Sequence, residues 1–169
     1  QGKLRAVLDS CDFCLARKRH LPKPTHGTRA GAFPGAIVHG DFAFIKVSDR
    51  ERQMPVWMAV DDCSDVGHTQ LLPKLNSSTA ALALEEQFSD SRRGAPVELA
   101  TDGDPVLCSY EVATVCSRSG VYHFVSAAYE SGSRERVEKA IYDWRCEYSK
   151  LIGDHTPKWS EAFCIVRRA

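Results

Sequence analysis

The feature that most constrains the fold is an apolar run, residues 37–47, that carries a single acid, Asp41, near its middle. A polar stretch at 48–53 and a second apolar run at 55–61 follow it. Two apolar runs joined by a short polar loop predict a β-hairpin. A carboxylate within a buried strand is costly unless it is paired or bound to a metal. Asp41 is therefore a candidate functional residue.

The rest of the chain alternates predicted strands and helices. Further strands are expected at 69–75, 97–101 and 122–127, and helices at about 77–88, 109–119, 132–153 and 159–166. Asn76, Ser77 or Ser78 can cap the first of these helices. Three strands in hairpin order followed by alternating helices and strands predict an α/β fold, with a five-stranded mixed sheet flanked by helices.

Length and charge describe a single globular domain. The chain has 169 residues, of which 43% are hydrophobic and 26% charged, and this length favours one domain. Its 22 Lys and Arg residues balance 22 Asp and Glu residues, so net charge alone does not indicate a nucleic-acid or membrane partner. Residues 1–30 nevertheless hold a surplus of five positive charges. No run approaches the roughly 18 apolar residues of a membrane span, and no secretory signal is recognisable.

Cysteines and linker residues indicate the compartment and the domain boundaries. The seven cysteines are irregularly spaced, which favours a reducing, intracellular compartment. Five of them are expected to be small buried residues: Cys63, Cys108, Cys116, Cys146 and Cys164. Pro and Gly residues crowd 21–35 and predict a linker between an element at 1–20 and a domain at 36–169. Because the sequence starts without a methionine and an apolar run at 4–8 is already under way, we expect a fragment of a longer protein.

Two more acids could join Asp41. Asp102 ends a predicted strand, and Glu135 lies in the first turns of a predicted helix. An open sheet binds ligands beyond the carboxyl ends of its strands, where converging carboxylates would suit Mg²⁺ or Mn²⁺. Each acid also has a structural interpretation, namely a hydrogen-bonded strand residue, a turn residue and a solvated helix face.

Other acids compete for the same role. Asp61 and Asp62 end the second apolar run, and a hairpin register that places Asp61 opposite Asp41 would put both on one face of the sheet. A slip of one residue would reverse that arrangement. Asp104 and Glu130 are weaker candidates.

Five stretches together resemble the integrase catalytic core of retroviruses and gypsy-type retrotransposons. They are Cys-Asp-Phe-Cys-Leu-Ala-Arg-Lys at 11–18, His-Gly-Asp-Phe at 39–42, Met-Ala-Val-Asp-Asp-Cys-Ser at 58–64, Ala-Thr-Asp-Gly-Asp-Pro at 100–105 and Ser-Gly-Ser-Arg-Glu-Arg-Val-Glu-Lys at 131–139. The resemblance covers nearly the whole chain. It implies a ribonuclease H-like fold in which Asp41, Asp102 and Glu135 are the catalytic, metal-binding triad, and it makes Asp61 a noncatalytic acid.

The resemblance also implies a reaction. In this family two Mg²⁺ or Mn²⁺ ions about 4 Å apart flank the scissile phosphate, and the enzyme processes the 3′ ends of element DNA and joins them to target DNA. Lys18, Arg19 and Lys23 are candidates for contacts with DNA phosphates, with a solvated linker as the alternative. At least a dimer and a nuclear location are further expectations.

The first matching stretch is similar to half of a zinc site. Cys11 and Cys14 correspond to the second half of the His-His-Cys-Cys module that precedes such cores, and zinc needs four ligands. The two histidines would lie upstream of residue 1, since the spacing of His20 and His26 follows no recognisable pattern. The sequence predicts an incomplete site here, with Zn²⁺ bound only if upstream histidines are present.

Departures from the family pattern leave two other functions open. The 32 residues between Asp102 and Glu135 are slightly fewer than usual, and 129–132 replaces a loop that borders the DNA in relatives. Glu138 stands where the family often has Asn. These changes favour a catalytically impaired, host-retained module that binds DNA or protein. A ribonuclease H-type nuclease would share the fold but not the preceding Cys-x-x-Cys and linker.

Overall fold

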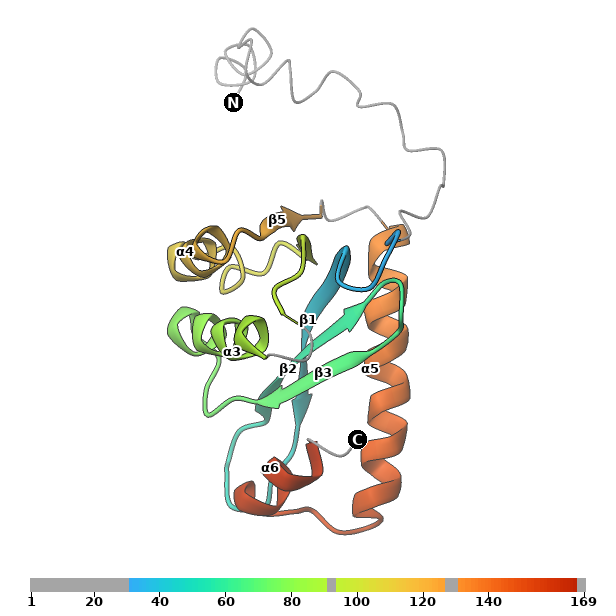
Figure 1. Cartoon of the computed structure of the whole chain (residues 1–169). Helices are drawn as coiled ribbons and strands as arrows, with labels where there is room; N and C mark the ends of the chain where they lie inside the picture. The colour runs from blue at the N-terminus through green and yellow to red at the C-terminus, as the bar shows by residue number, and fades with distance from the viewer. Residues whose placement is uncertain (1–30, 91–93, 127–130, 167–169) are drawn as a thin grey trace, which may run out of the picture.

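The computed structural model describes residues 31–90, 94–126 and 131–166, with the backbone alone at 131–136 (Figure 1). The expected zinc-type element at 1–20 and most of the linker at 21–35 lie outside these ranges. None of the helices in the described part is long and apolar enough to cross a membrane.

Five strands form one mixed sheet in the order β3-β2-β1-β4-β5. The strands are β1 (Ile37–Ile45), β2 (Met54–Asp61), β3 (Gly67–Leu71), β4 (Glu98–Thr101) and β5 (Tyr122–Val125). The first three are antiparallel neighbours, whereas β4 pairs parallel with β1 and β5 pairs parallel with β4. The predicted hairpin and the mixed five-stranded sheet are confirmed. The third strand ends earlier than expected, with Pro73, which lacks a backbone N–H, following soon after.

Four helices flank the sheet: α3 (Ser77–Ser89), α4 (Tyr110–Arg118), α5 (Ser131–Ile152) and α6 (Trp159–Val166). Local chemistry sets where they begin. Asn76 caps α3 by accepting a hydrogen bond from the Thr79 backbone at 2.9 Å, and Thr79 completes the capping box. Ser109 caps α4 in a similar way, and Gly120 follows that helix with φ +68°. Side-chain oxygens thus satisfy backbone donors that a helix start would otherwise leave unpaired.

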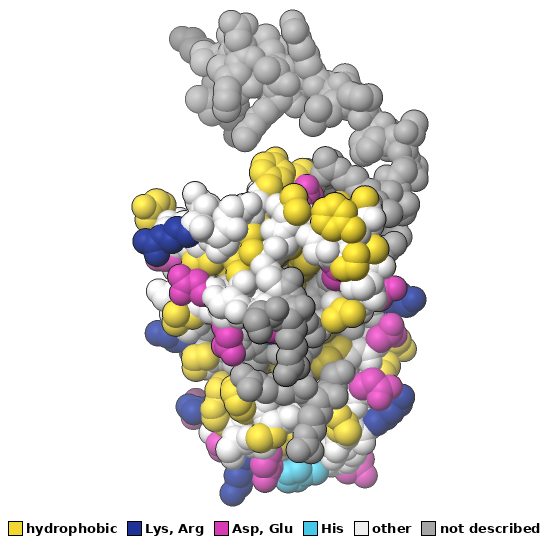
Figure 2. All heavy atoms as spheres, viewed as in Figure 1, with side chains coloured by type: hydrophobic (Ala, Val, Ile, Leu, Met, Phe, Trp, Pro, Cys, Tyr) yellow, Lys and Arg dark blue, Asp and Glu magenta, His cyan; other side chains and the backbone are white. Residues whose placement is uncertain are grey.

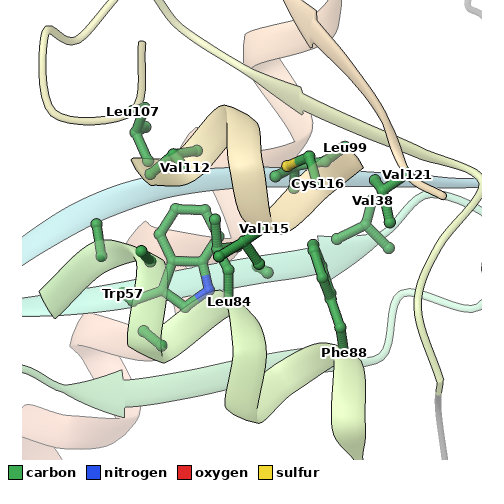
Figure 3. Close-up of a cluster of buried hydrophobic side chains, with 14 of the residues drawn as sticks. Val38, Trp57, Leu84, Phe88, Leu99, Leu107, Val112, Val115, Cys116 and Val121 are labelled. Carbon is green, nitrogen blue, oxygen red and sulfur yellow. The ribbon is translucent and has the colours of Figure 1, made fainter. Parts of the chain in front are cut away.

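Hydrophobic side chains fill both faces of the sheet. The α3/α4 core packs Trp57, Leu84, Leu99, Val112 and their neighbours between the sheet and the two helices (Figure 3). The α5/α6 core packs Val56, Met58, Val137, Ile141 and Trp144 with others on the opposite face. Strand β2 is buried along its whole length because it contributes to both cores. The helices therefore cover both faces and leave the ends of the strands as the place for a ligand.

Gly40 determines which face of the sheet each side chain of β1 occupies. A Cβ at this position would lie 2.1 Å from the Trp57 ring, closer than any real contact. The indole is fixed because its Nε1 donates a 2.7 Å hydrogen bond to Gln87 Oε1 and its ring meets Phe42 edge-on. Gly40 and Phe42 thus face the α3/α4 core. Since side chains alternate along a strand, Asp41 faces the α5 side.

Candidate active site

Two predicted acids, distant in sequence, lie on neighbouring strands. In the parallel pair of β1 and β4, Gly40 is the register partner of Thr101, so Asp41 and Asp102 follow at matching positions. Adjacent strands lie about 4.8 Å apart. Asp41 remains within β1, whereas Asp102 begins the loop after β4. Both side chains are partly exposed. The sheet therefore brings Asp41 and Asp102 to neighbouring positions.

Both acids line one cleft, with a volume of about 220 Å³. Its lining residues are His39, Gly40, Asp41, Ala100, Thr101, Asp102, Ser126, Val137 and Glu138. They come from β1, from the carboxyl end of β4, from the residue after β5 and from α5. The cleft thus occupies the strand-end position that open α/β sheets use for ligands.

Local hydrogen bonds orient the two carboxylates. Asp41 Oδ1 accepts from the Phe42 backbone N–H at 2.6 Å, and Asp102 Oδ1 accepts from the Asp104 backbone N–H at 3.0 Å. Asp104 Oδ1 in turn accepts from the Val106 backbone N–H at 2.7 Å. Asp104 is therefore a turn-forming residue, and it is not part of the cleft lining.

The electrostatic character of this region is visible at Cys108. Partial desolvation raises the pKa of the Cys108 thiol, and the negative charges of Asp102 and Asp104 raise it further. Cys108 lies outside the cleft lining, so this shift reflects the negative charge of the loop after β4. The oxygen donors of Asp41 and Asp102 are also the ligand type that Mg²⁺ and Mn²⁺ prefer.

Glu135 lies in α5, one helical turn before Glu138. The backbone of α5 thus brings this position to the helix segment that borders the cleft, and its role in the triad stays a prediction. Among the side chains that the structure describes, no group of three His, Cys, Asp or Glu residues is arranged to hold a metal. Asp41 and Asp102 are the part of the predicted triad that the structure places together.

The interpretation of Asp61 as a partner of Asp41 is wrong. Asp41 is the register partner of Met58, whereas Asp61 is opposite Val38. Asp61 accepts hydrogen bonds from the backbones of Gly35, Cys63 and Ser64 and from the Ser64 hydroxyl. Burial raises the pKa of Asp61, but these hydrogen bonds together hold it below its ordinary value. Asp61 stabilises the turn after β2 and has no place in the cleft.

Asp62 is also structural. Its Oδ2 accepts from the Gly31 backbone at 2.5 Å, and its Oδ1 lies 3.2 Å from His39 Nε2. Both side chains of the His39–Asp62 pair are buried. His39 itself lines the cleft. The contact with Asp62 therefore fixes the ring orientation of a residue in the cleft lining.

Sequence reasoning missed several residues of the cleft. His39 is one, although its position two residues before Asp41 on the same strand was a usable signal. Thr101 and Ser126 are others: the Thr101 hydroxyl lies 2.8 Å from His123 Nε2, and the Ser126 hydroxyl donates to the Thr101 carbonyl. Burial lowers the pKa of His123. These contacts connect β5 to β4 directly before Asp102.

The remaining predicted sites fall in two groups. Cys11, Cys14, Lys18, Arg19, Lys23 and Glu130 lie outside the described residues. Of the five later cysteines, which were expected to be buried, Cys116 is buried and Cys146 half-buried. The expectation is wrong for Cys63, Cys108 and Cys164, which are exposed, because they lie in loops or on the outer side of a helix.

No family model matches the chain, and no curated protein matches it. Solved structures do. A chain of the simian T-cell lymphotropic virus intasome, solved with the PP2A regulatory subunit B56 gamma, aligns with a TM-score of 0.71 at 22% identity; the alignment covers 98% of this chain and 58% of that one.

Two isolated integrase cores are also similar. The HTLV-2 integrase catalytic core domain, in complex with magnesium, gives a TM-score of 0.62 at 21% identity, with 73% of this chain and 77% of that one covered. The BIV integrase core gives 0.59 at 18% identity, with 78% and 82% covered. The chain therefore has the ribonuclease H-like fold of retroviral integrase catalytic cores.

Proposed function

We propose that the chain is an integrase core that catalyses divalent-metal-dependent processing of DNA 3′ ends and their transfer into target DNA. The observation that carries this proposal is the meeting of Asp41 and Asp102 in one cleft on adjacent parallel strands. Both residues also lie in the sequence motifs that resemble integrase cores. The magnesium in the HTLV-2 core, a protein of the same fold, supports a divalent metal.

Asp41 and Asp102 would hold the metal together with Glu135. Bound metal ions of this kind activate a nucleophile and stabilise the departing 3′ oxygen. The carboxylates then serve as ligands, and the backbone hydrogen bonds from Phe42 and Asp104 keep them oriented. The open cleft, of about 220 Å³, would hold a phosphodiester and its ions. Contacts there would be to the DNA backbone and would depend little on the base sequence.

The partners follow from the reaction. DNA is the substrate, and Lys18, Arg19 and Lys23 would add contacts with phosphates from outside the core. Self-association is part of the proposal because the HTLV-2 core was solved in dimeric and trimeric forms. Such a reaction would take place in the nucleus.

An oligonucleotide assay tests the proposal. Incubating the full chain with duplex ends of the parent element and Mg²⁺ or Mn²⁺ should produce shortened 3′ ends and then joined products. Cleavage of an RNA–DNA hybrid without joining would indicate a ribonuclease H-type nuclease instead.

A noncatalytic, host-retained binding module is the second candidate. Glu138 favours it, because this cleft residue stands where the resembled family often has Asn. A melting experiment separates the catalytic core from the binding module. At a free Mn²⁺ concentration of about 100 times its Kd, a metal-binding core should gain about 2.7 kcal/mol in its free energy of unfolding. A module that has lost its site would show no such shift, and Asp41→Asn should abolish the shift in a working core.

A further inference from the structure

Glu138 is a cleft residue for which the predicted triad gives no role. It lies on α5 directly after Val137, whose side chain is buried in the α5/α6 core and fixes that turn of the helix against the sheet. The Glu138 side chain is exposed, and it lines the same cleft as Asp41 and Asp102. A third described carboxylate thus borders the place where metal and DNA would meet.

The charges around the cleft are strongly unequal. Three described lining residues, Asp41, Asp102 and Glu138, are acids, and among the described lining residues the one basic side chain is His39. His39 Nε2 faces the buried carboxylate of Asp62. On the face drawn in Figure 2, by comparison, acidic and basic side chains are interspersed. The described lining of the cleft carries a net negative charge, which repels a phosphodiester when no cation is present.

We propose that Glu138 makes DNA binding in this cleft conditional on divalent metal, by strengthening metal binding and by weakening DNA binding when the metal is absent. This inference rests on the proposed function. Because no three described acids are arranged as a ligand set, Glu138 acts through its charge, at a distance, and not as a ligand. Metal and DNA are then thermodynamically coupled, and each raises the affinity for the other by the same factor.

The test measures that coupling in Glu138→Gln. Fluorescence anisotropy gives the Kd of a labelled DNA duplex with EDTA and with saturating Ca²⁺, at one fixed ionic strength. Glu138→Gln should bind DNA about threefold more tightly without metal and about as tightly as the wild type with saturating Ca²⁺, so its ratio of the two Kd values should fall about threefold. Its apparent Kd for Mn²⁺, from melting curves, should rise about threefold.

Asp143→Asn is the matched control. Asp143 is an exposed acid on the same helix and is not part of the cleft lining, so the substitution removes the same charge elsewhere. Its Kd ratio should stay within about twofold of the wild-type ratio.

The outcomes separate the inference from the proposed function. If the wild type responds to Mn²⁺ but Glu138→Gln has the wild-type Kd ratio, the role of Glu138 is wrong and the metal site stands. Equal changes in Glu138→Gln and Asp143→Asn would also overturn it, because net charge would then explain the effect. If the wild type shows no response to Mn²⁺, both the function and the inference fail.

Discussion

Two pairs of aspartates in this domain look alike in sequence and differ in structure. Asp61 and Asp62 are buried, and their oxygens accept hydrogen bonds from backbone N–H groups, a serine hydroxyl or a histidine. Asp41 and Asp102 are partly exposed and open into a cleft. The first pair holds a turn and the start of the domain together, whereas the second lines the cleft. Surroundings, and not residue type, separate a structural acid from a candidate metal ligand.

The largest effect should come from the cleft pair. Asp102→Asn is expected to lower strand transfer at least about a hundredfold, because a carboxylate ligand is replaced by a neutral amide. The fold should persist, since the amide oxygen can still accept the hydrogen bond from Asp104. Product formation on radiolabelled oligonucleotides measures the loss.

Asp104→Asn provides the control for that experiment. It lies in the same loop but outside the cleft lining, and it should retain activity within about threefold. Equal activity of Asp102→Asn and the wild type would remove Asp102 from the site.

Gly40→Ala tests the arrangement that turns Asp41 toward the cleft. Its Cβ would overlap the Trp57 ring, so we expect a loss of about 3 kcal/mol in the free energy of unfolding. Urea unfolding measures it. Gly103→Ala is the comparison, because a Cβ there meets nothing within 4 Å. Similar stability of both variants would mean that Trp57 does not determine the orientation of β1.

Asp61→Ala probes the buried pair. It removes the acceptor for backbone N–H groups of Gly35, Cys63 and Ser64 and should cost about 2 kcal/mol of stability. The effect of Mn²⁺ on melting should be unchanged. Asp154→Ala, at an exposed turn position, should be nearly neutral. If Asp61→Ala folds but no longer responds to Mn²⁺, Asp61 contributes to metal binding, and the two pairs do not differ in role.

The smallest effect is the pH dependence of Asp61. Its pKa in the folded protein is below the ordinary value of 3.8, so its ionised form stabilises the fold above that value. This contribution is lost as the pH falls through the lower, folded-state pKa. The stability difference between the wild type and Asp61→Asn should therefore shrink below about pH 4, as measured by urea unfolding. A constant difference would contradict the assignment.

Local patterns were sufficient to predict much of the fold. Apolar runs and turn residues located the hairpin, and the cap candidates Asn76, Ser77 and Ser78 indicated where α3 begins. The acids at 41 and 102 became candidates because each interrupts or ends a strand and matches a family motif. Register was not predictable from these patterns, because it depends on which strands pair and how far they slide. The alternative that pairs Asp61 with Asp41 stayed open for that reason.

Packing between strands could also not be predicted from local sequence patterns. The dependence of Gly40 on Trp57 joins residues on neighbouring strands, and the exposure of Cys108 and Cys164 depends on what covers a loop or a helix. His39 could have been assigned to the cleft by alternation along β1. Its buried partner Asp62 could not, because that contact depends on how β1 and the turn after β2 meet.

The hydrogen bond between Trp57 and Gln87 links α3 to the orientation of β1, the strand that carries Asp41. Gln87 lies on α3, yet it holds the indole that leaves Gly40 no room for a side chain. A substitution of Gln87 would loosen the indole and let β1 shift. If the proposed function holds, screens for loss of activity should therefore recover variants on a helix that does not line the cleft, and their defect would be a displaced Asp41.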